Sequence, residues 1–206
     1  MDKNLRLFIA VPITPRIKKR IGEVITRFKT LGADIKWVPE ENLHTTLKFL
    51  GDTPIGKVDK ITEALEKTLT AFETSRLRFR GIGAFPNMHN PRIIWVGSES
   101  VNSKLTAIAS AIDEAMASLG FEKEEKKFKA HLTIGRVRGP KGIPELMKEI
   151  EKIKQQEIDS MKITEIHLVK SDLQRTGPIY TTIKKFPLFE SSEQFSGPKR
   201  NNEEVV

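Results

Sequence analysis

The chain has 206 residues, of which 38% are hydrophobic, enough for a sizeable core in one domain or in two small lobes. It contains no cysteine, which excludes disulfides, thiolate metal sites and a cysteine nucleophile. The net charge of +8 favours polyanionic partners, and RNA, DNA and an anionic membrane surface are all compatible with it.

The N-terminal residues lack the charged and then apolar layout of a signal peptide. The apolar run at residues 7–11 is too short to span a bilayer. We therefore expect a cytosolic protein that does not insert into a membrane.

The first half of the chain predicts strands that alternate with amphipathic helices. Apolar residues at every second position are typical of a half-buried strand, and apolar residues at three- and four-residue intervals are typical of a helix. On this basis we expect a strand at 5–11, a helix at 15–31, extended segments at 37–38 and 43–50, a helix at 55–72, and strands at 77–82 and 93–96.

The second half repeats this theme. We expect a helix at 101–119, a strand at 130–137, a short helix at 143–154, and strands at 163–170 and 179–186. Because no obvious linker separates the halves, we interpret them as the two lobes of one α+β domain over residues 1–190. The polar tail at 191–206 shows little periodicity, and we expect it to be disordered.

Two segments inside predicted strands share a His-x-Thr-hydrophobic pattern, at residues 44–47 (HTTL) and 131–134 (HLTI). Side chains alternate between the faces of a strand, so each histidine points the same way as the threonine two residues later. Either string alone is most simply an ordinary strand sequence that arose by chance. Two such strings, one in each half, favour a shared site in which both pairs bracket one ligand.

A phosphate is the natural ligand for two imidazoles and two hydroxyls. Hydrolysis of a cyclic phosphodiester needs a base for water and an acid for the leaving ribose oxygen, and two histidines supply both near neutral pH. Thr46 and Thr133 would hold the non-bridging oxygens. Arg136 could add a cation, although strict alternation places it opposite His131 unless Gly135 bends the strand. This chemistry requires no metal and no other cofactor.

The longer strings at residues 37–51 (WVPEENLHTTLKFLG) and 130–136 (AHLTIGR) resemble the two-histidine phosphoesterases, and in particular their 2′-5′ RNA ligase branch. Further likeness lies at residues 6–10, 85–97 and 168–180. The resemblance spans about residues 5–189. It implies a fold of two pseudo-symmetric lobes, with antiparallel sheets and flanking helices around a central cleft.

The same resemblance implies hydrolysis of RNA 2′,3′-cyclic phosphate to a 2′-phosphate end, together with reversible 2′-5′ joining. Its site residues fall on the catalytic pair His44 and His131, the phosphate-holding Thr46 and Thr133, the cation Arg136, and Phe8 and Phe49 for the terminal base. We assign His131 as the proton acceptor and His44 as the proton donor. The symmetric motifs equally permit the reverse assignment.

Three functions remain open at this level: the hydrolase, an RNA-joining enzyme that uses the same site in reverse, and a non-catalytic RNA-binding module. The expected partner is RNA with a 2′,3′-cyclic phosphate end, such as a tRNA half, and we expect a monomer. A metal site is disfavoured, because the sequence contains no H-x-x-x-H string and no carboxylate-rich cluster. His89 and His167 lack the motif, and we expect surface or structural roles for them, with His89 also a candidate to line the cleft. Tyr180 is left unassigned.

Overall fold

The computed structural model describes residues 4–100, 103–175 and 177–190. The helices are α1 (Pro15–Lys29), α2 (Val58–Leu69), α3 (Lys104–Ser118) and α4 (Ile143–Ile153). The strands are β1 (Asn4–Pro12), β2 (Ile35–Trp37), β3 (His44–Pro54), β4 (Ser75–Phe85), β5 (Ile93–Ser100), β6 (His131–Val137), β7 (Glu157–Ile163), β8 (Glu165–Leu173) and β9 (Pro178–Pro187). The short 3-10 helices η1 (Glu40–Asn42) and η2 (Ile55–Lys57) precede β3 and α2.

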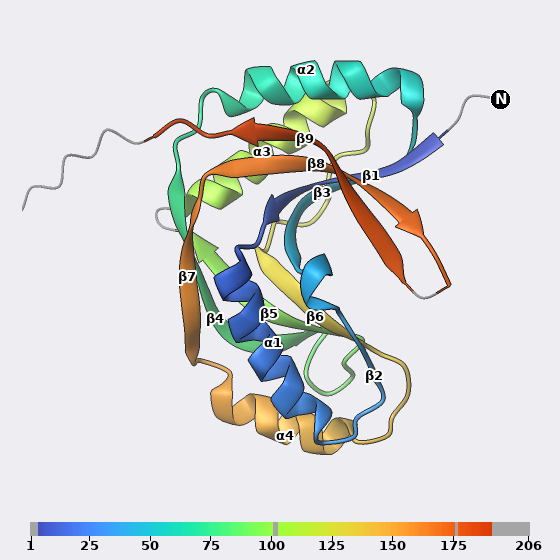
Figure 1. Cartoon of the computed structure of the whole chain (residues 1–206), viewed down its shortest axis with the longest axis vertical. Coiled ribbons are helices and arrows are strands. Elements are labelled where there is room, and N and C mark those ends of the chain that lie inside the picture. Colours follow the sequence, from blue (N-terminus) through green and yellow to red (C-terminus); the bar gives the residue numbers. More distant parts are fainter. Residues whose placement is uncertain (1–3, 101–102, 176, 191–206) are drawn as a thin grey trace, which may run out of the picture.

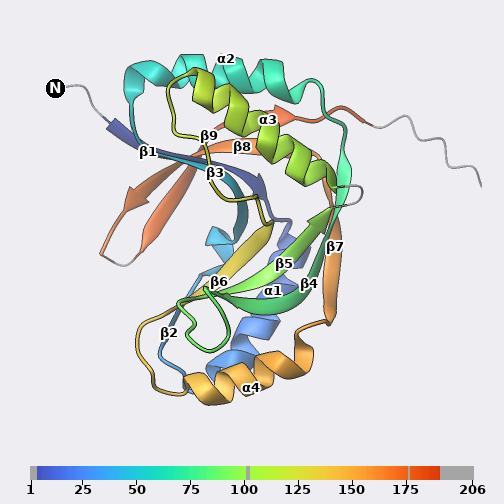
Figure 2. The same ribbon diagram turned by 180° about the vertical axis from the view of Figure 1, so that it is seen from behind.

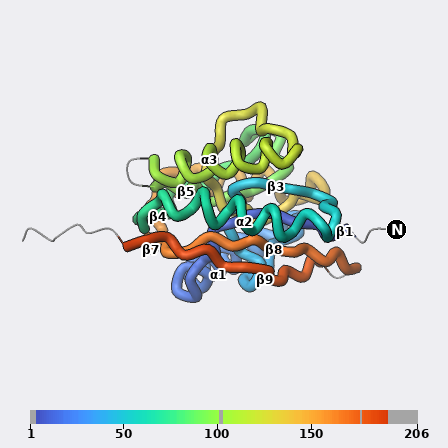
Figure 3. Tube along the Cα trace, turned by 90° about the horizontal axis from the view of Figure 1, so that it is seen from above, coloured from blue at the N-terminus to red at the C-terminus, as the bar shows by residue number. Residues whose placement is uncertain are grey.

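The described strands form two antiparallel sheets. Sheet A has the order β3-β1-β8-β9, and sheet B has the order β2-β6-β5-β4-β7. Sheet A lies in the upper lobe with α2 and α3, and sheet B lies in the lower lobe with α1 and α4 (Figures 1 and 2). Viewed from above, α2 and α3 run beside each other next to the strands of sheet A (Figure 3). This arrangement confirms the bilobal α+β fold that the resemblance implies.

The two halves of the sequence do not each form one lobe, and that part of our interpretation is wrong. β1 and β3 lie in sheet A, but β4 from the same half lies in sheet B. In the second half, β6 and β7 lie in sheet B, whereas β8 and β9 lie in sheet A. Each half therefore contributes strands to both sheets. This arrangement brings β3 and β6, the two strands with the His-x-Thr pattern, into contact.

Helix α1 illustrates how the predicted elements form their core. Its apolar side chains Ile17, Ile21, Ile25 and Phe28 are all buried at helical spacing. Burying one such side chain contributes about 1.5–3 kcal/mol. Because α1 packs against η1, this burial also fixes the polar face of its first turns beside the segment that leads into β3.

Strand β7 is absent from the elements that we predict from the sequence. It pairs with β4 from Ser75↔Ile163 to Arg80↔Glu157 and forms the edge of sheet B. Only Met161 and Ile163 of this strand are buried, so its sequence carries little apolar alternation. The tail at 191–206 lies outside the described residues. Within the part of the chain that the structure describes, no helix is long and apolar enough to cross a membrane.

Candidate active site

His44 and His131 are the first residues of β3 and β6, and both are oriented in the same way. The Nδ1 atom of His44 lies 2.7 Å from the carbonyl oxygen of Asn42, and the Nδ1 atom of His131 lies 2.8 Å from that of Lys129. A carbonyl only accepts, so Nδ1 must carry the proton and donate it in both rings. In the neutral form, Nε2 of each ring is then the nitrogen free to accept a proton.

Both motif strands contain a bulge at the same offset from their histidine. In β3 the pairing passes from Ala10↔Thr46 to Ile9↔Lys48, so that Leu47 and Lys48 both face the core. In β6 it passes from Trp95↔Thr133 to Ile94↔Gly135, so that Ile134 and Gly135 both face the core. A bulge inserts one residue and reverses the alternation beyond it.

The bulges decide which later residues share a face with the histidines. The fifth residue after each histidine, Phe49 in β3 and Arg136 in β6, returns to the face of the motif and is exposed. The bulge in β6 lies at Gly135, where a bend is needed to bring Arg136 onto the face of His131. The two strands are therefore related in geometry, but one ends its motif with an aromatic ring and the other with a cation.

We define inner face A as the face of sheet A that carries His44 and Thr46, and inner face B as the face of sheet B that carries His131 and Thr133. The two faces influence each other electrostatically. Burial is the main cause that lowers the pKa of His44, and the charge of His131 adds to it; burial raises the pKa of Tyr180 of β9, and the charge of Arg136 opposes that rise. Residues of the two sheets are therefore close enough to interact, as the contact between β3 and β6 also indicates.

The imidazole of His44 is enclosed by aromatic rings. Its ring centroid lies 4.8 Å from that of Phe8 and 5.1 Å from that of Tyr180, which meets it edge to face. Burial lowers the pKa of His44, because it disfavours the imidazolium form, and the charges of Lys18 and His131 act in the same direction. The hydrogen bond to the Asn42 carbonyl opposes this shift. The free site therefore favours neutral His44.

His131 has a different environment. The ring of Phe85 meets it edge to face at a centroid distance of 5.1 Å, and Phe85 in turn packs against Trp95 at 5.2 Å. The carbonyl that orients His131 belongs to the exposed connection between α3 and β6. The two histidines thus have matched hydrogen bonds but unequal enclosure.

The two phenylalanines expected to contact a base differ in exposure. Their rings lie 6.1 Å apart, but Phe8 is only 3% exposed whereas Phe49 is 62% exposed. Phe8 packs with Ala10 and Val169 on inner face A, beneath the ring of Tyr180. Phe8 offers almost no surface to a base, and its main contact in the site is with His44.

Three further residues support His44, and our sequence reasoning did not assign them. Lys18 of α1 donates to the carbonyl oxygen of Glu41 at 2.8 Å, and the side-chain amide of Asn42 donates to the carbonyl oxygen of Pro178 at 3.0 Å. The segment that orients His44 is therefore held from both lobes. Tyr180 follows Pro178 by two residues and completes the wall around the imidazole. No sequence pattern links these positions to the motif, because they come together only through the fold.

The remaining two histidines lie outside the motif strands and make other contacts. His167 is 9% exposed, and its Nε2 atom lies 2.7 Å from a carboxylate oxygen of Glu165. His89 is exposed in a loop where its backbone N–H donates to the side chain of Asn87. Among the described residues, no group of three or more His, Cys, Asp or Glu side chains converges as a metal-ligand set does.

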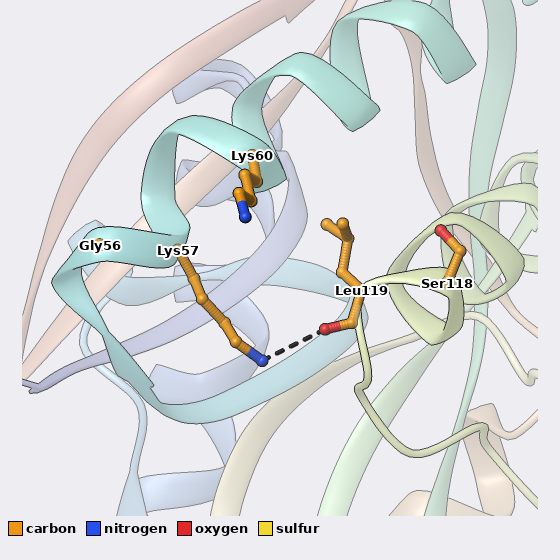
Figure 4. Close-up of a pocket in the computed structure, with 5 residues that line it drawn as sticks. All are labelled: Gly56, Lys57, Lys60, Ser118 and Leu119. Carbon is orange, nitrogen blue, oxygen red and sulfur yellow. Dashed lines mark hydrogen bonds between the residues drawn. The ribbon is translucent and has the colours of Figure 1, made fainter.

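A separate cavity of about 280 Å³ lies between the beginning of α2 and the end of α3 (Figure 4). Lys57 reaches across it and donates to the carbonyl oxygen of Leu119 at 3.2 Å. This bond satisfies a carbonyl at the C-terminal end of α3, where cations are favourable. The cavity contains neither histidine motif, and Lys57, one of the two lysines that line it, has a structural partner.

Comparison with known proteins agrees with this geometry. The model of the LigT like Phosphoesterase family matches the chain twice, at residues 11–95 and 96–180, with one His-x-Thr motif in each match. The RNA 2′,3′-cyclic phosphodiesterase of Methanocaldococcus jannaschii is 38% identical over 182 residues, which are 88% of this chain and 100% of that protein. The enzyme of the same name from Methanothermobacter thermautotrophicus is 34% identical over 185 residues, 90% of this chain and 100% of its own.

Solved structures share the fold. The protein TT0787 of Thermus thermophilus superimposes with a TM-score of 0.77 at 25% identity and covers 90% of this chain and 99% of its own. E. coli LigT complexed with 3′-AMP superimposes with a TM-score of 0.73 at 21% identity, covering 90% and 98%, and supports the fold alone. Two family matches that together span residues 11–180, and relatives aligned over their full length, lead to one conclusion: the chain belongs to the LigT-like phosphoesterase family.

Proposed function

We propose that this protein is an RNA 2′,3′-cyclic phosphodiesterase that opens the cyclic phosphate to a 2′-phosphate end. The observation that carries the proposal is the pair of imidazoles on contacting strands, each with Nδ1 bonded to a backbone carbonyl and Nε2 available. The relatives that match over most of the chain have this activity in their names. The net charge of +8 suits an RNA substrate.

In the proposed reaction, Nε2 of His131 accepts a proton from water as the water oxygen bonds to phosphorus. The bond from phosphorus to the 3′ oxygen breaks, and protonated His44 gives its Nε2 proton to that oxygen. Thr46, Thr133 and Arg136 would hold the non-bridging oxygens, where negative charge increases in the transition state. His131 takes up one proton and His44 releases one, so the proton count of the enzyme is unchanged over one turnover.

The lowered pKa of His44 places a requirement on this assignment. A neutral His44 cannot act as an acid, so the substrate must favour its protonation. A phosphodiester anion beside the imidazole does so, because an opposite charge within a few ångströms raises the pKa of a histidine. The reverse assignment, with His44 as the base, needs no such help and is separated from the first by the leaving-group substitution given below.

The exposed ring of Phe49 is our candidate for the terminal base, since stacking on an aromatic ring contributes about 1–3 kcal/mol. We assign Phe8 to the support of His44. Ligation is a second reaction at the same site, in which a 5′-hydroxyl replaces water and forms a 2′-5′ bond. As substrates we expect RNA such as tRNA halves, bound by a cytosolic monomer.

The test uses an oligonucleotide with a 2′,3′-cyclic phosphate end, incubated in EDTA, and identification of the product end. His44→Gln and His131→Gln should each lower kcat by about 10²–10⁴, the usual contribution of a general acid or base, with little change in RNA affinity. His89→Gln is the matched control and should retain full activity. Retained turnover in either motif variant would refute the two-histidine mechanism, and RNA binding without turnover by the wild type would favour the binding module.

A further inference from the structure

Inner face A continues away from His44, first as the buried cluster of Phe8, Ala10 and Val169 and then as an exposed surface. Phe8 and Ala10 of β1 lie on this face, so Arg6 also lies on it by alternation. Val169 of β8 lies on the same face, and the regular pairing from Val169↔Thr182 to Leu173↔Pro178 extends it to Leu173. The surface therefore runs from the site to the end of the β8–β9 hairpin.

Two side chains on this surface are unusually available. Arg6 is exposed and makes no salt bridge to another residue in the described ranges, although Asp52 pairs with it in register on β3. Leu173 is 69% exposed, the highest value among the large apolar side chains described. The guanidinium can bind a phosphate, and the exposed apolar side chain can pack against a base, so the two together suit a nucleotide.

The surface is connected to the catalytic residues through Tyr180. Its ring contacts both Phe8 and His44, and its backbone pairs in register with Ser171 of β8, two residues from Val169 and on the same face. Phe49 also lies beside Phe8. The order along inner face A is thus His44, then the Phe49 and Tyr180 rings, then Arg6, and finally Leu173.

We infer that this surface binds the nucleotide that precedes the cyclic-phosphate end of a single-stranded RNA. With the cyclic phosphate at the histidines and the terminal base at Phe49, the phosphate that joins the last two nucleotides lies at Arg6. The base of the preceding nucleotide packs on Leu173 of the β8–β9 hairpin. The inference rests on the proposed function and adds a second nucleotide subsite to it, so that oligonucleotide ends are preferred over cyclic mononucleotides.

The test compares cytidine 2′,3′-cyclic monophosphate with a cytidine trinucleotide that has the same cyclic end. Arg6→Gln should lower kcat/KM for the trinucleotide about tenfold, as expected for loss of one charge-assisted phosphate contact, and change that for the mononucleotide less than about twofold. Loss of one phosphate contact should also reduce the slope of log KM against log salt concentration by about 0.7 for the trinucleotide. Leu173→Ser should lower kcat/KM for the trinucleotide alone.

Arg76→Gln is the matched control, because Arg76 is an exposed arginine on β4 of the other sheet. It should change neither substrate's kcat/KM nor the salt slope. An equal effect of Arg6→Gln on both substrates, or no effect on either, overturns the inference and leaves the proposed function in place. If the wild type hydrolyses neither substrate, both the inference and the proposed function are overturned.

Discussion

A buried ion pair joins the strand of the first motif to the connection that leads to the second. The ammonium of Lys48 in β3 is 2% exposed and lies 2.5 Å from a carboxylate oxygen of Asp113 in α3. It also donates to the carbonyl oxygen of Glu122 at 2.7 Å. Residue 122 begins the exposed segment that ends at Lys129, whose carbonyl orients His131. Lys48 therefore holds together the supports of both histidines.

Asp113→Ala should strongly destabilise the protein. It leaves a buried ammonium without its counter-ion, and breaking a buried pair in this way costs about 3–5 kcal/mol. At about 2–4 °C per kcal/mol for a domain of this size, the Tm should fall by about 6–20 °C. Lys48→Met should cost less, because the carboxylate that it leaves without a counter-ion is 18% exposed and still accepts from the backbone N–H of Glu124.

The assay is urea unfolding followed by circular dichroism, with Glu114→Ala as the matched control. Glu114 lies next to Asp113 in α3 and pairs with Lys123, but both partners of this pair are more than half exposed, at 64% and 55%. Loss of an exposed pair should change the free energy of unfolding by no more than about 1 kcal/mol. A cost below about 1 kcal/mol for Asp113→Ala, or equal costs for Asp113→Ala and Lys48→Met, would refute the reasoning.

Three further predictions concern the histidine environments. If His44 is the acid, a cyclic substrate with sulfur in place of the 3′ oxygen should restore much of the kcat of His44→Gln, because a thiolate leaves without a proton; restoration of His131→Gln instead would reverse the two roles. Lys18→Met should raise the pKa of His44, because it removes a positive charge that lowers it; the shift is measured by NMR titration of the imidazole, and the exposed Lys19→Met should produce none. Gly83→Ala should destabilise the protein by about 1–3 kcal/mol, because a Cβ there would lie 2.4 Å from the ring of Trp95, and should lower kcat through Phe85 and His131. Gly56→Ala, where a Cβ meets nothing within 4 Å, should stay within about 0.5 kcal/mol in the same denaturant titration, and equal midpoints for the two variants would contradict the packing argument.

Strand parity is the part of the site that the sequence predicts best. His44 and Thr46 share a face, as do His131 and Thr133, because side-chain alternation is a local property of any extended segment. The amphipathic helices and most strands follow from apolar spacing for the same reason. Strand β7 could not be predicted from apolar spacing, since an edge strand needs few buried side chains.

The amino-acid sequence by itself determined the two His-x-Thr strands and the chemistry that two imidazoles and two hydroxyls permit. Only the tertiary structure decided which other residues join them. The bulges that return Phe49 and Arg136 to the motif face depend on register with β1 and β5, and the lowered pKa of His44 depends on burial by Phe8 and Tyr180 and on the charge of Lys18. Register and burial arise from segments far apart in the chain, and no local pattern encodes them.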